Sequence, residues 1–154
     1  VKGSTRYPLR LKSEDSVVEA NLDASNFEIN GSQVLFWIDF DAGNSIQPDN
    51  SGSGSGNGYR LKAHIHIFSR SQSGRIEGRV LPPDADPIIK AVIGSDTATA
   101  IPDDDDGEFK IVGLRAGTYT LLVDGQNGYR DTLLTNIIVR NGEDTHVPQL
   151  TLHR

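Results

Sequence analysis

Cysteine is absent from the 154 residues of this chain. Disulfides, zinc–thiolate sites, iron–sulfur clusters and thiol catalysis are therefore excluded for this sequence. Methionine is also absent, which predicts that Val1 is not the translational start and that an upstream segment has been removed. Aromatic residues make up only 6%, and the longest unbroken apolar run, residues 34–38, is far too short to cross a bilayer.

Positive charge is scarce as well. The 15 Lys and Arg residues stand against 21 Asp and Glu, which gives a formal net charge of −6. No basic cluster longer than two residues occurs, so nucleic acid is not an expected partner. The apolar fraction of 36% and the 16 glycines are normal for a globular chain, which argues against disorder and a collagen-like repeat.

Short segments of alternating polarity dominate the sequence, and no long window has helical periodicity. Residues 34–41, 59–67 and 117–123 are the clearest examples, each typical of a half-buried strand. The pattern predicts that the inward side chains are Phe36, Ile38, Phe40, Tyr59, Leu61, Ala63, Ile65, Ile67, Tyr119, Leu121 and Val123. Further strands are expected over residues 9–12, 17–22, 75–81, 88–93, 108–112, 134–139 and 146–152.

Turn dipeptides separate these strands. Asn-Gly and Asp-Gly pairs, which tolerate positive φ, occur at residues 30–31, 106–107, 124–125, 127–128 and 141–142. Many short strands at this spacing predict an all-β fold of the sandwich or barrel type.

The composition breaks at two places. Residues 51–58 (SGSGSGNG) read as a flexible hairpin tip between the strands that end at Asp41 and begin at Tyr59. Their glycine spacing does not fit a dinucleotide fingerprint or a phosphate-binding loop. A second polar stretch, residues 69–74, predicts a division of the chain into two β-sandwich-type units, residues 1–73 and 74–154.

The second half contains an ordered series of short motifs: GRIEGRV at 74–80, PIIKAV at 87–92, DDDGEF at 104–109, GLRAGTY at 113–119 and IVRNG at 138–142. In this order the motifs resemble the carboxypeptidase regulatory-like domain. The resemblance implies a seven-stranded sandwich related to transthyretin that serves as an accessory module without peptidase chemistry of its own. The run of four aspartates at 103–106 is denser than the family pattern requires.

The first half carries YPLRLK at 7–12, VLFWIDFDAGNSI at 34–46 and GYRLK at 58–62. These segments resemble the C-terminal part of an uncharacterised bacterial domain that occurs in surface lipoproteins. The resemblance implies that the N-terminal strands of that domain are missing from residues 1–73. Such a fragment would expose unpaired strand edges, which predicts a homodimer.

Two strands carry candidate metal ligands. Asp39 and Asp41 share one face of the first strand, and His64 and His66 share one face of the second. If the two strands pair, the four side chains could meet and hold zinc or another divalent ion. The alternative is that both pairs simply point to water, as alternation alone predicts.

The acidic turn Asp103, Asp104, Asp105 and Asp106 raises the possibility of calcium. EF-hand spacing fails, because aligning Gly107 with the loop glycine puts Pro102 at the first ligand position and Gly113 at the twelfth. A calcium loop of another kind and a solvated turn both stay open. Trp37 is either an aromatic platform for a sugar or a contact with the neighbouring domain.

No spacing of Ser, His and acidic residues matches a hydrolase motif, so neither an enzyme nor a cofactor is expected. The prediction is a non-enzymatic structural or interaction module, either adhesive or scaffolding. Its expected place is secreted, periplasmic or on the outer surface as a lipoprotein, with a protein or glycan as partner. The alternative is a carbohydrate-binding module that acts through Trp37 and the loop at residues 51–58.

Overall fold

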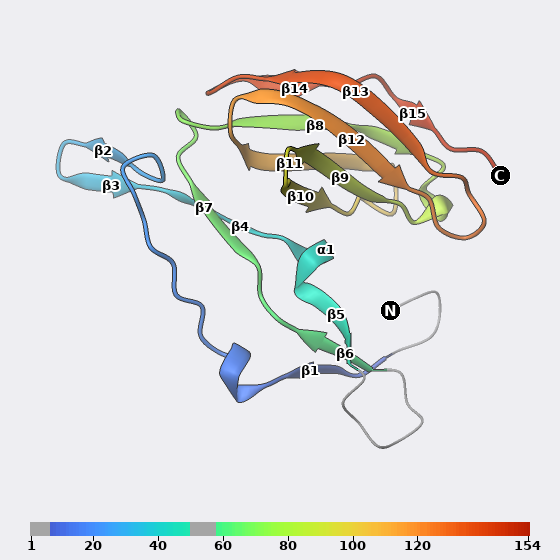
Figure 1. Cartoon of the computed structure of the whole chain (residues 1–154), viewed down its shortest axis with the longest axis horizontal. Coiled ribbons are helices and arrows are strands. Elements are labelled where there is room, and N and C mark those ends of the chain that lie inside the picture. The colour runs from blue at the N-terminus through green and yellow to red at the C-terminus, as the bar shows by residue number, and fades with distance from the viewer. Residues whose placement is uncertain (1–6, 50–57) are drawn as a thin grey trace.

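The computed structural model of the chain describes residues 7–49 and 58–154 and is built almost wholly of β-strands (Figure 1). Strands of the first half form three small sheets, and those of the second half form two stacked ones. The elements of the first half are β1 (Leu9–Leu11), η1 (Ser13–Asp15), β2 (Glu28–Asn30), β3 (Gln33–Leu35), β4 (Trp37–Phe40), α1 (Ala42–Ser45), β5 (Ile46–Asp49), β6 (Gly58–Leu61) and β7 (Ile65–Phe68).

The second half is a closed sandwich. Its elements are β8 (Gly74–Leu81), η2 (Pro83–Ala85), β9 (Ile88–Ile93), β10 (Asp96–Ala100), β11 (Glu108–Leu114), β12 (Gly117–Asp124), β13 (Thr132–Val139), β14 (Asp144–His146) and β15 (Leu150–Thr151). One sheet has the order β10-β9-β12-β13 and the other the order β11-β8-β14. Because β14 and β15 both pair with β8 in parallel, they share one position, and the sandwich has seven strand positions.

The core of the sandwich follows from alternation. In β12 the side chains of Tyr119, Leu121 and Val123 are buried, and Leu121 is 0% exposed. Phe109 and Ile111 of β11 enter the same core from the facing sheet. The prediction of an all-β fold is therefore confirmed, and so is the inward orientation predicted for Tyr119, Leu121 and Val123.

The first half has no comparable core. Its three sheets have the orders β1-β6-β5, β2-β3 and β4-β7. Phe68 is its only buried hydrophobic residue among those described, and it lies where β7 reaches the sandwich. Sheets of two or three strands are marginal when no other layer covers them.

A single turn of helix interrupts what the sequence presents as one long strand pair. Asp41 is the N-cap of α1, and its carboxylate accepts a hydrogen bond from the Asn44 N–H. Pairing resumes around the insertion, because the Lys62 N–H donates to the Ser45 carbonyl oxygen and the Asp41 N–H donates to that of His64. β4 pairs with β7 and β5 pairs with β6, so the predicted pairing of the two segments is confirmed. The hairpin tip expected at 51–58 lies, apart from Gly58, outside the described residues.

Within each of two sheets, β4-β7 and β1-β6-β5, the register collects apolar side chains on one side. In β4 and β7, Ile38 lies opposite Ile67 and Phe40 lies opposite Ile65. In the three-stranded sheet, Tyr59 of β6 likewise lies between Leu9 of β1 and Pro48 of β5. Leu61 lies between Leu11 and Ile46 in the same way. We call the whole set the uncovered apolar face; its members are Leu9, Leu11, Ile38, Phe40, Ile46, Pro48, Tyr59, Leu61, Ile65 and Ile67.

This face is exposed, contrary to the prediction from alternation. Phe36, Ile38 and Phe40 were expected to point inward, but Ile38 is 61% and Phe40 48% exposed. Ile65 of β7 is exposed as well. Alternation correctly sorted the side chains by face, yet Ile38, Phe40 and Ile65 are left exposed in the described chain.

Four strand assignments also differ. The expected strand 146–152 contains only the last residue of β14 and the short β15. Residues 17–22 form no strand, and their apolar side chains are exposed because no partner strand lies beside them. The expected strand 34–41 is split between β3 and β4, and the expected strand 59–67 is split between β6 and β7 opposite α1. Within residues 7–49 and 58–154, no helix has the length and apolar character needed to cross a bilayer.

Candidate functional site at the junction of the strand pair and the sandwich

The polar side of the β4–β7 pair faces the sandwich. Asp39 lies directly opposite His66, and Trp37 lies directly opposite Phe68. The approach to the sandwich is close at Gly113 of β11, where a Cβ atom would lie 2.7 Å from the Phe68 ring and 2.8 Å from the His66 ring. Gly113 has a φ of +69°, so both its backbone conformation and its surroundings favour glycine.

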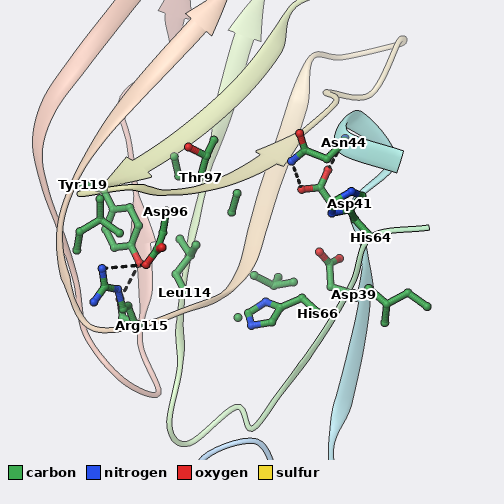
Figure 2. Close-up of a pocket in the computed structure, with 16 residues that line it drawn as sticks. Asp39, Asp41, Asn44, His64, His66, Asp96, Thr97, Leu114, Arg115 and Tyr119 are labelled. Atoms are coloured by element: carbon green, nitrogen blue, oxygen red, sulfur yellow. Dashed lines mark hydrogen bonds and ion pairs between the residues drawn. The ribbon is translucent and has the colours of Figure 1, made fainter. Parts of the chain in front are cut away.

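A cleft of about 350 Å3 lies at this junction (Figure 2). Its lining includes all four metal-ligand candidates, Asp39, Asp41, His64 and His66. The sandwich contributes residues of β9 to β12, among them the ion pair of Arg115 with Asp96 at 3.0 Å. Figure 2 shows the two groups of side chains on opposite sides of the cleft.

The four candidates line the same cleft but are not gathered around one point in the described part of the chain. No group of three His, Cys, Asp or Glu side chains there is placed to share one ion. The reason lies in α1, because Asp41 is turned into the helix cap while Asp39 stays on the strand. The divalent-ion hypothesis stays a prediction.

Asp41 has a structural role that the sequence pattern does not reveal. Its carboxylate accepts hydrogen bonds from the Asn44 N–H at 3.0 Å and the Asn44 side chain at 2.8 Å. It also accepts a hydrogen bond from the Thr99 hydroxyl and one from the Thr99 N–H at 3.3 Å. Burial by itself would raise the pKa of Asp41, but the hydrogen bonds from Thr99 and Asn44 outweigh it and hold the pKa below its ordinary value.

Thr99 belongs to β10, the edge strand of the sandwich, so Asp41 connects the two halves of the molecule. The helix approaches this strand closely, since a Cβ atom on Gly43 would lie 2.5 Å from the Thr99 hydroxyl oxygen. We call these contacts of Asp41, Gly43 and Thr99 the α1–β10 clasp.

Asp39 has the opposite electrostatic character. Burial raises its pKa, and the nearby negative charge of Asp41 raises it further, while His66 acts in the other direction. A carboxyl group in this state is a weaker acid than usual and would favour a cationic or hydrogen-bond-donating neighbour.

Sequence reasoning missed the sandwich side of the cleft. Tyr119 was predicted as a core residue, which is confirmed, but its hydroxyl also donates to the Arg115 carbonyl oxygen at 3.0 Å beside the cleft. Arg115 and Asp96 are far apart in sequence and follow no motif, so no signal in the sequence pairs them. The side-chain hydroxyls that line the cleft come from Thr97 and Tyr119, and that of Tyr119 is engaged by a backbone carbonyl oxygen.

Trp37 lines a second cleft, of about 250 Å3, between β4 and the sandwich. The Arg70 guanidinium lies 5.9 Å from the centroid of its ring. Arg75, Glu143 and Asp144 supply polar groups on the far side, with Arg75 and Asp144 joined as an ion pair. The side chain thus points toward the sandwich, in the direction expected for a contact between the halves, and a role as a sugar platform stays a prediction.

The acidic turn organises its own backbone. The Asp103 carboxylate accepts from the Asp105 N–H, and the Asp106 carboxylate accepts from the Glu108 N–H, both at 2.8 Å. Asp106 also lies 3.6 Å from Arg79. These contacts give two of the four carboxylates a role in the turn that needs no ion.

The linker at 69–74 is a hydrogen-bonded turn. Ser69 is fully buried and donates to Glu28 at 2.6 Å, and the Ser71 N–H donates to the same carboxylate at 2.9 Å. The hydroxyls of Ser69 and Ser71 hold the pKa of Glu28 below its ordinary value. The division of the chain near residue 73 stays a prediction.

No protein-family model matches the chain, and no curated protein matches it. Among solved structures, two chains from type II cohesin–X-dockerin complexes of Acetivibrio cellulolyticus match with identities of 22% and 21% and TM-scores of 0.42 and 0.41. Each match covers 51% of this chain and 56% of that structure. A minor pilin of Streptococcus agalactiae matches at 15% identity and a TM-score of 0.36, covering 62% of this chain and 50% of the pilin. This chain thus spans about half the length of these structures, and likenesses at such TM-scores do not bear on its function.

Proposed function

We propose that this chain is a non-enzymatic interaction module of a cell-surface or periplasmic protein. In this proposal the sandwich is a rigid support, and the first half presents a docking surface for another macromolecule. The observation that carries the proposal is the uncovered apolar face, because a sheet with one apolar side must bury that side against another layer.

The contrast between the two halves supports this assignment. The sandwich closes its own core, with Ile76, Val80 and Leu121 fully buried. The first half instead packs the side of β4 and β7 that carries Asp39, His66 and Phe68 against the sandwich and leaves Ile38 and Phe40 exposed. A chain that needed only to fold by itself would gain stability by covering Ile38 and Phe40 as well.

The size of the face also supports docking. Six of its exposed members present apolar surface of the order of 500 Å2, given the usual area of aliphatic and aromatic side chains. A monomeric protein seldom exposes a contiguous apolar patch larger than a few hundred Å2, and larger ones are typical of interaction sites. Those members are Leu9, Leu11, Ile38, Phe40, Ile46 and Ile65.

The placement outside the cytoplasm and the accessory role of the sandwich rest on the two resemblances. The seven strand positions agree in number with the carboxypeptidase regulatory-like sandwich that the motifs of residues 74–142 suggest. A leader or lipid-attachment signal in the full-length precursor would support the surface location, and a precursor directed to the cytoplasm would contradict it.

The test compares Phe40→Asp with Ile138→Asp. Both side chains are about half exposed on a strand, but Ile138 lies on β13 of the sandwich, away from the uncovered apolar face. We expect the unmodified chain either to associate or to bind the fluorescent apolar probe ANS, and Phe40→Asp alone to reduce that signal. A chain that does neither, or one that turns over a peptide or ester substrate, would contradict the proposal.

A carbohydrate-binding role is the second candidate, and the Trp37 cleft is the observation that favours it. An aromatic ring beside Arg75, Glu143 and Asp144 combines the apolar and polar groups that a sugar requires. Affinity electrophoresis in polysaccharide gels tests it. Retardation that is lost in Trp37→Ala supports this role, and free migration in every polysaccharide removes it.

A further inference from the structure

The uncovered apolar face is the strongest unexplained feature of the molecule, and it is suited to one particular occupant. We infer that it packs face to face against the same face of a second copy of this chain, related by a twofold axis. This inference rests on the proposed function, because it names the partner for the same docking surface.

The chemistry of the face favours a copy of itself. All ten members are apolar residues or tyrosine, and none is charged. A twofold interface places the same patch on both partners, so the patch must be complementary to itself. An uncharged apolar sheet meets this condition, whereas a charged partner would lose hydration there without gaining an ion pair.

The charges of the first half lie on the other side of the same strands. In the ladder of β1, β6 and β5, Arg10, Arg60 and Gln47 alternate with the apolar positions. Arg60 binds Asp15 at 2.6 Å, and Arg10 lies 3.6 Å from Asp49. Two copies that meet through the apolar side would leave these ion pairs undisturbed, and the net charge of −6 per copy would act only from a distance.

The available area is sufficient for a dimer. Two faces of the order of 500 Å2 each would remove about 1,000 Å2 of surface from water, which is the lower range for a specific interface. The partly exposed members Tyr59, Leu61 and Ile67 and the polar margin would add to this value. Two sheets packed in this way form a sandwich with a layer spacing of about 10 Å, which is the layer missing from the first half.

The face stays accessible in its own chain, since Ile38, Phe40 and Ile65 are exposed even though Ile65 borders the junction cleft and Ile38 borders the Trp37 cleft. The register places Ile38 and Phe40 on the side of β4 opposite to Asp39, which lines the junction cleft. The sequence alone predicted association through strand edges. The face is the stronger reason to expect association, because water can satisfy exposed edge groups but cannot remove the cost of exposing apolar side chains.

The first experiment is sedimentation velocity over a wide concentration range. We expect the unmodified chain to form a reversible dimer, and Ile38→Asp to raise the dimer dissociation constant at least about tenfold, since it would bury a charge near its own symmetry mate. The control is Ile138→Asp, which changes a similarly exposed isoleucine on β13 and should leave the constant unchanged. Near-native circular dichroism of each variant establishes that it folds.

The second experiment uses the absence of cysteine. Ile38→Cys, Phe40→Cys and Ile65→Cys each introduce the only thiol of the chain, so a disulfide can form only between two copies. Mild oxidation should give a covalent dimer in at least one of the three, and no more than slow background coupling in Ile138→Cys. Coupling that is equal in all four variants would overturn the inference.

The outcomes separate this inference from the proposed function. The chain could be monomeric at every concentration and still bind ANS, with the binding lost in Ile38→Asp. That result would show an open docking face for another macromolecule. It would overturn the inference that a second copy is the partner and would support the proposed function. A monomer that binds no ANS overturns both. A dimer whose dissociation constant responds to Ile138→Asp rather than to Ile38→Asp also overturns the face-to-face arrangement.

Discussion

Removing the Asp41 carboxylate should loosen the first half from the sandwich. In Asp41→Ala the N-cap of α1 is lost, which typically costs about 0.5–2 kcal/mol. The charged hydrogen bonds from Thr99 are lost as well, and such bonds are worth about 1.5–3 kcal/mol. Because both effects act through one carboxylate they do not add fully, and the expected loss is about 2–4 kcal/mol.

Differential scanning calorimetry can measure this loss. For a chain of this size the melting temperature should fall by roughly 5–12 °C, if unfolding is cooperative. If the two halves melt separately, mainly the lower transition should move, because Asp41, Gly43 and Thr99 are not members of the buried core around Leu121. Thr99→Val is the matched variant, and a double-mutant cycle with Asp41→Ala should give a coupling energy of about 1 kcal/mol or more.

The pH dependence of the melting temperature tests whether the ionised Asp41 carboxylate stabilises the fold. The pKa of Asp41 is lowered by folding, so its contribution is present above the ordinary value of 3.8 and is lost as the pH falls through the lower, folded-state pKa. The gap in melting temperature between the unmodified chain and Asp41→Ala should therefore close in strong acid. A gap below about 1 °C at neutral pH would refute the clasp as a stabilising contact.

Three further predictions concern the junction and the turn. In urea denaturation, Gly113→Ala should destabilise the chain by about 1–3 kcal/mol more than Gly94→Ala. Both glycines have positive φ, but only a Cβ atom at residue 113 would collide with side chains of β7. Equal losses of stability in the two variants would argue against close packing at Gly113. Asp39→Asn should raise the melting temperature at neutral pH, since folding raises the pKa of Asp39 and its charged form is disfavoured above that pKa. The gain should disappear as the pH falls to the ordinary value of 3.8, and a gain that persists below it would contradict the electrostatic explanation. The melting temperature should be the same in calcium as in a chelator, because backbone N–H groups already engage two carboxylates of residues 103–106. A melting temperature that rises with calcium and then saturates would support the calcium-loop hypothesis.

Alternation predicted the sandwich well because the sandwich supplies its own second layer. Tyr119, Leu121 and Val123 were assigned to the core from their spacing, and the facing sheet does bury them. The same reasoning failed for Ile38 and Phe40. Periodicity shows which side chains share a face, but it contains no information on whether another layer covers that face.

The candidate site was predicted only in part. Pairing of the two strands brought Asp39, Asp41, His64 and His66 to one cleft, as their spacing had suggested. The pattern could not show that Asp41 caps a helical turn, because AGNS after an aspartate is equally compatible with a loop. The contribution of Arg115 and Asp96 depends on the packing of β10 beside β11, which is a tertiary contact without a local signal.

The parallel pairing of β8 with β14 and β15 has a mechanical consequence. The chain enters the sandwich at the start of β8 and leaves it after β15. The first strand, β8, runs beside the last strands, β14 and β15, in the same direction. Tension between the ends of the sandwich would therefore load these hydrogen bonds in shear, so that they would have to break together rather than one by one. A module stretched between a cell and its surroundings would yield abruptly at high force, and force spectroscopy should record a single steep rupture instead of gradual unzipping.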